Sequence, residues 1–125
     1  MTGFILFAHG SKVQTANDGV TAVSEQLTRR LNHPVETAFL ECAPPTMSDA
    51  TSTLTRQGVD EIIVVPYFLT MGIHLTRDLP QIVKDLQVIY PTVKFQITEP
   101  LEGHPALLEV LVLRSKEAMN ARQAY

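Results

Sequence analysis

The chain has 125 residues, a length that suits one domain with a core of its own. Ten basic and thirteen acidic residues give a net charge of −3, so no positive field draws the chain to nucleic acid or to a membrane surface. The apolar run at the N-terminus breaks at His9, too early for a signal peptide or a membrane span. We therefore expect a single cytoplasmic domain over residues 1–125 that binds neither nucleic acid nor membrane.

Short apolar runs alternate with longer segments of helical periodicity, which is typical of β-α units around a parallel sheet. The expected strands are residues 3–8, 35–41, 61–66 and 93–98. The expected helices are residues 15–31, 47–57 and 78–90, with a last helix from Pro105. This α/β pattern predicts a flavodoxin-like three-layer sandwich, with a four-stranded parallel sheet in the order 2-1-3-4.

The last helix is apolar on nearly all sides over residues 107–113. We expect one side to cover the sheet of its own chain, while the other side needs a second cover. A partner subunit could supply that cover.

Two cofactor classes are not supported by the sequence. Neither glycine-rich phosphate-binding motif follows the first strand, so we expect no nucleotide. Cys42 is the single cysteine, and one thiolate cannot hold an iron–sulfur cluster. We expect Cys42 to be a small buried apolar residue.

The loops after the first and third strands each carry a histidine, His9 and His74. In an open sheet of this kind, ligands bind beyond the carboxyl ends of the strands, where the winding reverses. The order 2-1-3-4 makes these two strands neighbours, so both imidazoles should open onto one crevice. Imidazole binds transition metals and accepts protons near neutral pH. With Glu41 at the end of the second strand, the set would form an open site that can pass its metal on.

A plain structural role is the alternative for each histidine. Taken singly, His9 or His74 is more often a hydrogen-bonded loop residue than a ligand, and only their convergence makes a metal site an equal alternative. His33 lies in a turn at the opposite edge of the sheet, and we interpret it as a solvated turn residue. His104 could contact a ligand or serve as a polar group before the last helix, and we favour the second interpretation.

Several segments in order along the chain resemble one family. They are His9-Gly10-Ser11, Phe39-Leu40-Glu41, the run VVPYFLTMGIH at 64–74, and Asp78-Leu79-Pro80. Together they resemble the short, single-domain sirohydrochlorin chelatases called CbiX or SirB. The resemblance implies the chelatase-like form of the flavodoxin-like fold. It also implies an ATP-independent class II metal chelatase, a lyase that inserts cobalt, nickel or ferrous iron into sirohydrochlorin with release of two protons. Its product would serve cobalamin, siroheme or coenzyme F430 biosynthesis.

The resemblance also implies roles for particular residues. The metal ligands would be His9 and His74, with His9 also accepting a proton. From its place at the end of the second strand, we also expect Glu41 to assist catalysis. The tetrapyrrole would contact one loop and two further positions: Leu69, Thr70, Met71, Gly72, Ile73 and His74, with Ser11 and Pro44. A chain of this length resembles the form that pairs as a homodimer. Two alternatives to an enzyme stay open, a non-catalytic carrier of metal or tetrapyrrole using the same crevice, and an interaction module that docks through its last helix.

Overall fold

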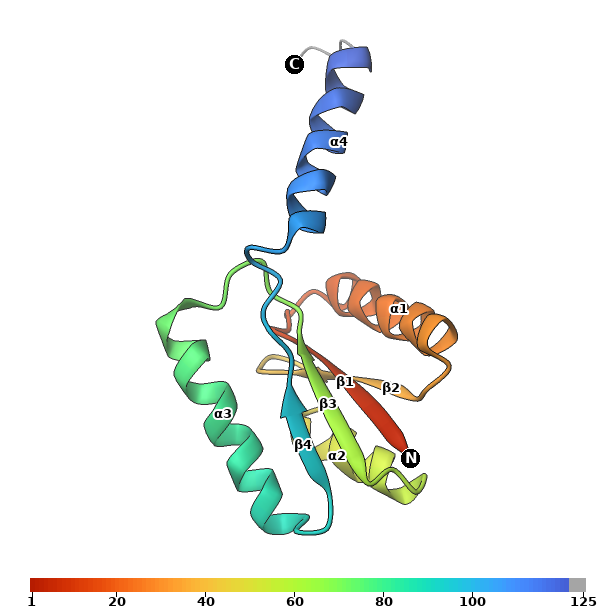
Figure 1. The fold of residues 1–125 in the computed structure, drawn as a ribbon, viewed down its shortest axis with the longest axis vertical. Helices are drawn as coiled ribbons and strands as arrows, with labels where there is room; N and C mark the ends of the chain where they lie inside the picture. Colours follow the sequence, from red (N-terminus) through yellow and green to blue (C-terminus); the bar gives the residue numbers. More distant parts are fainter. Residues whose placement is uncertain (122–125) are drawn as a thin grey trace.

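The computed structural model describes residues 1–121, so the last four residues of the predicted domain 1–125 lie outside the described part. The elements follow one another in strict β-α alternation (Figure 1). They are β1 (Thr2–Ala8), α1 (Gln14–Leu31), β2 (Val35–Phe39), α2 (Met47–Arg56), β3 (Glu61–Pro66), α3 (Gly72–Ile89), β4 (Lys94–Ile97) and α4 (Pro105–Ala121). All strand pairs are parallel and the order is β2-β1-β3-β4, which confirms the predicted fold class and topology.

The hydrophobic core lies on one face of the sheet, beneath α2 and α3. Ile5 on β1 and Ile62 on β3 are fully buried there, and Leu54 of α2 and Leu79 of α3 pack onto them. Each such side chain contributes roughly 1.5–3 kcal/mol through removal from water. This core fixes β1 and β3 side by side, and so fixes where the segments that follow them begin.

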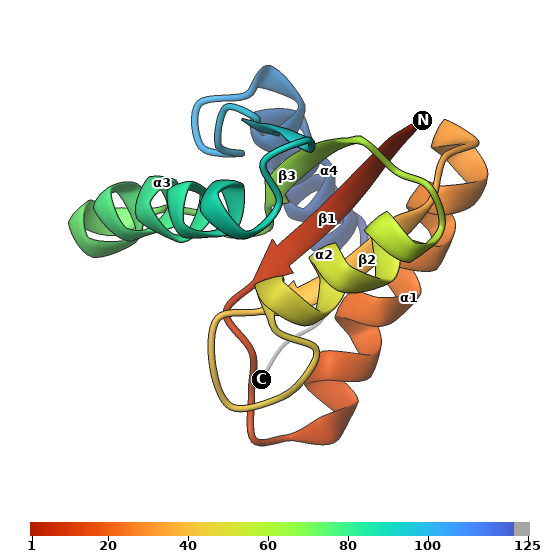
Figure 2. The ribbon, with the colours of Figure 1, turned by 90° about the horizontal axis from the view of Figure 1, so that it is seen from below.

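The opposite face is covered by α1 over β2, and Figure 2 shows the long helices α1 and α3 flanking the sheet. The contact of α1 with the sheet includes polar groups, since the hydroxyl groups of Ser24 and Thr37 are buried and 2.6 Å apart. The same face continues across β3 through Ile63 and Val65, which are only half-buried. This half of the face therefore lacks a covering helix within the described chain.

Helix α4 does not fill that gap. Figure 1 shows it extending away from the sheet, and none of its described residues is buried. The expectation that one side of this helix covers the sheet of its own chain is therefore wrong. The segment after β4 continues past the carboxyl edge of the sheet, so α4 begins beyond that edge and does not fold back (Figure 1). Among residues 1–121, no helix is long and apolar enough to cross a bilayer.

His104 belongs to the start of this helix. Its Nδ1 accepts a hydrogen bond from the backbone N–H of Ala106 at 3.0 Å. This bond satisfies one of the amides that a helix N-terminus leaves without a partner. The geometry agrees with the structural interpretation of His104, as a polar group before the last helix.

Glu36 on β2 should make the stability of the fold depend on pH. Partial burial raises the pKa of its carboxyl group above the ordinary value of 4.5. Below pH 4.5 the group is mostly protonated in both the folded and unfolded states, so it does not lower the free energy of unfolding. As pH rises through the folded-state pKa, the unfolded state has already ionised at a lower pH, so the free energy of unfolding falls. Glu36→Gln should therefore raise the thermal midpoint at pH 7 and leave it nearly unchanged at pH 4, as differential scanning calorimetry at both pH values can establish.

Candidate functional site

His9 follows β1 directly and lies beside Glu41, from the segment after β2. The regular strand β2 ends at Phe39, earlier than the predicted residue 41. Backbone pairing nevertheless continues, because Leu40 N–H donates to Ala8 O at 2.9 Å and Glu41 N–H donates to His9 O at 3.0 Å. These bonds bring Nε2 of His9 to 3.2 Å from Oε1 of Glu41.

Gly10 makes this close approach possible. Its φ is +93°, in the left-handed region, and a Cβ at this position would overlap the carbonyl oxygen of Glu41. A side chain at residue 10 would therefore force the two loops apart and separate His9 from Glu41.

The hydrogen bonds of His9 define what can lie between its ring and Glu41. Nδ1 is 3.0 Å from the carbonyl oxygen of Gly10, which can only accept, so Nδ1 carries a proton. In neutral His9 the Nε2 lone pair then faces a carboxylate oxygen, and two acceptors need a cation between them. A proton or a metal ion can fill this role. An ion about 2.1 Å from both atoms, at an angle of about 90–109°, would place them about 3.0–3.4 Å apart.

Asn17 anchors the loop that carries His9, and the sequence analysis did not identify it. Its side chain is 4% exposed, accepts from the Ser11 N–H at 2.9 Å and donates to the Ser11 carbonyl at 2.8 Å. The amide thus holds both backbone groups of Ser11 against α1. A polar residue on the sheet side of a helix is the kind of feature that could have identified it.

Replacing Asn17 with alanine should destabilise the protein by about 1–3 kcal/mol, because both backbone groups of Ser11 lose their partner next to a buried site. Thermal or urea unfolding measures this change. The neighbouring variant Asp18→Ala removes only an exposed contact with Gln14 and should change stability far less. Equal stability of the two variants would mean that Asn17 does not anchor the loop.

The loop after β2 differs from the prediction at Cys42. The side chain is exposed and not buried, so the expected role as a small core residue is wrong. Its φ is +71°, a left-handed backbone conformation that occurs in turns. This turn places Cys42 at the surface and not in the core, where the prediction had placed it.

His74 lies in the first turn of a helix and not in a loop, because α3 begins at Gly72 and not at residue 78. The prediction ended the preceding loop at Thr76 and began the helix at Asp78. Pro80 lies within the observed helix, where a proline removes one backbone hydrogen bond. Burial of Leu75 and Leu79, 9% and 1% exposed, extends the apolar face of the helix back past the proline. His74 is therefore held by a helix, one turn from its N-terminus.

A cavity of about 350 Å³ brings the two histidines together at the carboxyl edge of the sheet. It is lined by His9, Leu40, Phe68, Thr70, Met71, Gly72, Ile73, His74, Leu75 and Asp78. The lining therefore contains both predicted metal ligands and residues 70–74 of the predicted substrate loop. Leu69, Ser11 and Pro44 do not line it, and Glu41 reaches it only through its contact with His9.

The prediction missed some of the residues that line this cavity. Leu40, Leu75 and Asp78 were not predicted as lining residues, and Phe68 both packs on the core and borders the cavity. Ile73 is 84% exposed and Leu40 is 38% exposed. Exposed apolar side chains beside two imidazoles form a surface suited to a flat, largely apolar ring.

The two histidines do not belong to one assembled metal centre in the described residues. No group of three His, Cys, Asp or Glu side chains within residues 1–121 has the geometry to hold a metal ion. The cavity thus combines a preformed pair, His9 with Glu41, and a separate imidazole, His74.

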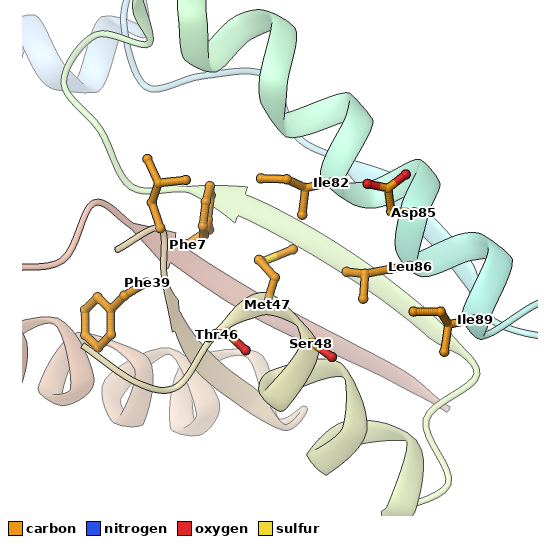
Figure 3. A pocket seen from close by; sticks show the side chains of 10 residues that line it. Phe7, Phe39, Thr46, Met47, Ser48, Ile82, Asp85, Leu86 and Ile89 are labelled. Atoms are coloured by element: carbon orange, nitrogen blue, oxygen red, sulfur yellow. The ribbon is translucent and has the colours of Figure 1, made fainter. Parts of the chain in front are cut away.

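A second cavity, of about 250 Å³, lies between α2 and α3 (Figure 3). Its walls are mainly apolar, with Met47 and Leu86 among them, and it touches the histidine cavity at Leu40. Its one ionisable group is Asp85 and it contains no histidine, so an anionic ligand or a transition metal finds no suitable partner there. Of these two cavities, only the one that contains His9 and His74 offers imidazole ligands.

Comparisons with known proteins point to one family. The CbiX family model matches residues 3–118. A sirohydrochlorin cobaltochelatase from Saccharolobus islandicus is 36% identical over 126 residues, which cover 96% of this chain and 98% of the relative.

Two solved structures share the fold. A protein from Marinobacter aquaeolei described as a cobalamin (vitamin B12) biosynthesis CbiX protein aligns with a TM-score of 0.86 and 26% identity, over 97% of this chain and 99% of its own. The sirohydrochlorin chelatase SirB from Bacillus subtilis, in complex with cobalt, aligns with a TM-score of 0.84 and 25% identity. That alignment covers 93% of this chain but only 50% of SirB.

Proposed function

Since this chain belongs to the CbiX family, we propose that it is a sirohydrochlorin chelatase, a lyase that needs no ATP. Residues 1–125 act as one chelatase domain in this proposal. The observation that carries it is the placement of His9 and His74 on one apolar cavity at the carboxyl edge of the sheet. A metal-insertion site needs metal ligands, a proton acceptor and a surface for the ring, and this cavity offers all three.

The reaction exchanges one divalent ion for two protons. The ring loses two pyrrole protons as its nitrogens bind the ion, which in turn loses its water ligands. Nε2 of His9 faces the Glu41 carboxylate, so a proton accepted there is stabilised as an imidazolium–carboxylate pair. Both side chains are more than half exposed, at 59% and 58%, so the proton can pass on to solvent.

The metal site in this proposal has open coordination positions and binds its ion weakly. His9 and Glu41 offer one pair of ligands, His74 offers a third from the other side of the cavity, and the remaining positions are left to water and ring nitrogens. A closed set of four protein ligands would retain the ion, whereas this arrangement lets the ring compete for it.

Cobalt is the first ion to test, since the relative from Saccharolobus islandicus is named a cobaltochelatase and SirB was solved with cobalt. Ferrous iron and nickel remain substrates within the proposal, because imidazole and carboxylate ligands accept each of these ions. The pathway that receives the product follows from the metal that the cell supplies.

The test that separates an enzyme from a carrier is turnover. Sirohydrochlorin and cobalt are mixed in large excess over the protein, and the absorbance change of the ring is followed. An enzyme should convert many equivalents of ring per protein at a rate above the spontaneous one. A carrier would bind one equivalent and leave the spontaneous rate unchanged, which would overturn the proposal.

We also propose that the chain acts as a homodimer in which α4 packs on the second copy. Most of the stability of a helix in a protein comes from the packing of its apolar face, and α4 has no buried residue, so it needs a partner surface. The half-buried Ile63 and Val65 mark such a surface on the sheet. SirB supports a second copy as the occupant, because this chain spans only half of its length.

A further inference from the structure

His74 and Arg77 face each other in the first turns of α3. Nη2 of Arg77 is 3.2 Å from Nδ1 of His74. A guanidinium group can only donate, so Nδ1 must accept and its lone pair points at Arg77. Neutral imidazole has one lone pair, and its proton is then on Nε2. In this arrangement neither ring nitrogen of His74 has a lone pair free for a metal ion.

The two histidines of the cavity are therefore in opposite states. His9 carries a proton on Nδ1 and directs Nε2 at the Glu41 carboxylate, an arrangement that attracts a cation. His74 presents an N–H on Nε2 and shares its remaining lone pair with a cationic neighbour, an arrangement that rejects one. A metal ion that enters alone can bind the His9–Glu41 pair, but at His74 it has to compete with Arg77.

The Arg77 side chain is held only weakly in its contact with His74. It is 69% exposed, and its other polar contact in residues 1–121 is a 3.4 Å interaction of Nε with Oδ1 of Asp78, itself more than half exposed. Exposed ion pairs of this kind contribute little to stability. A carboxylate can accept two parallel hydrogen bonds from a guanidinium, a stronger partner than an imidazole nitrogen.

We propose that Arg77 is a positioning residue that competes with metal for Nδ1 of His74 until a carboxylate of the tetrapyrrole draws the guanidinium away. The identity of that carboxylate rests on the proposed function, since sirohydrochlorin carries several. The ring then binds first, its carboxylate frees Nδ1 of His74, and the full set of metal ligands forms only when an acceptor for the metal is present.

The first test measures cobalt binding to the protein without tetrapyrrole, by isothermal titration calorimetry. Arg77→Met removes the donor and should tighten cobalt binding about threefold to tenfold, the order expected when one solvent-exposed hydrogen bond is lost. Arg56→Met, an exposed arginine on α2, is the matched control and should leave the affinity unchanged. Equal affinity in wild type and Arg77→Met would overturn the proposal.

The second test determines which nitrogen of the His74 imidazole carries the proton. Long-range ¹H–¹⁵N correlation spectra report which nitrogen carries the proton, and wild-type His74 should show it on Nε2. Arg77→Gln keeps a donor but loses the charge, so it should retain this tautomer and the weak cobalt binding while raising KM for sirohydrochlorin. A proton on Nδ1 of wild-type His74 would overturn the proposal.

These readouts separate the inference from the proposed function. If the wild-type His74 proton is on Nε2 and Arg77→Met tightens cobalt binding but wild type has no turnover, the Arg77 control of metal binding stands and the chelatase assignment fails. If turnover is present but Arg77→Met leaves the cobalt affinity unchanged, the chelatase stands and this inference fails.

Discussion

His74→Ala should lower kcat for metal insertion by about 10²-fold or more, the range found when a positioned acid–base or metal ligand is removed. His74 is the only imidazole on the α3 side of the cavity, and the lining as described offers no other nitrogen ligand there. Its side chain is exposed in the first turn of α3, so its removal leaves the core intact. Initial rates of ring metallation with saturating cobalt measure the effect.

The matched control for this variant is His33→Ala. His33 is exposed, lies in the turn before β2 at the amino edge of the sheet, and contacts Phe4 with ring centroids 6.0 Å apart. It should keep wild-type kcat. Comparable losses in both variants would indicate a general effect of histidine removal, and full activity of His74→Ala would remove this residue from the site.

Leu111→Asp should convert the dimer into monomers, with the dimer dissociation constant rising by about 10²-fold or more. Leu111 is 59% exposed in the middle of α4. In the proposed dimer it becomes buried, and an isolated carboxylate in an apolar interface is strongly unfavourable. Sedimentation equilibrium over a range of protein concentrations measures the change.

Val88→Asp provides the control for the α4 variant. Val88 is 80% exposed on α3, so it places the same charge on another exposed helix. This variant should sediment as wild type does. A wild-type protein that is monomeric at all concentrations, or a Leu111→Asp variant that stays dimeric, would contradict the role given to α4.

The order of the sheet was predictable because it depends on patterns that the whole chain repeats. Four apolar runs separated by helical segments leave few arrangements of a parallel sheet. In a doubly wound sheet the chain reverses its direction of winding after β2, and this reversal makes β1 and β3 neighbours. That adjacency alone brings the segments after both strands to one edge. The sharing of one cavity by His9 and His74 follows from it, and the structure confirms that both line the same space.

Other features depend on contacts that no local pattern records. The start of α3 was predicted six residues too late, at 78 and not at 72, because the burial of Leu75 that supports the first turns is a tertiary effect. The role of Asn17 depends on how the six-residue segment from Ser11 folds back onto α1, a backbone path that side-chain periodicity does not record. The position of α4 was missed for a related reason, since its apolar surface shows that it needs cover but not which chain supplies it.

In the proposed function, this cavity metallates a tetrapyrrole and His9 takes part. The measurement that tests it most directly is the absorbance of sirohydrochlorin mixed with cobalt, alone, with wild-type protein and with His9→Ala. We predict a conversion faster than the spontaneous one that returns to the spontaneous rate in the variant. Wild-type protein that binds the ring without accelerating its conversion, or a His9→Ala variant as fast as wild type, would contradict the account.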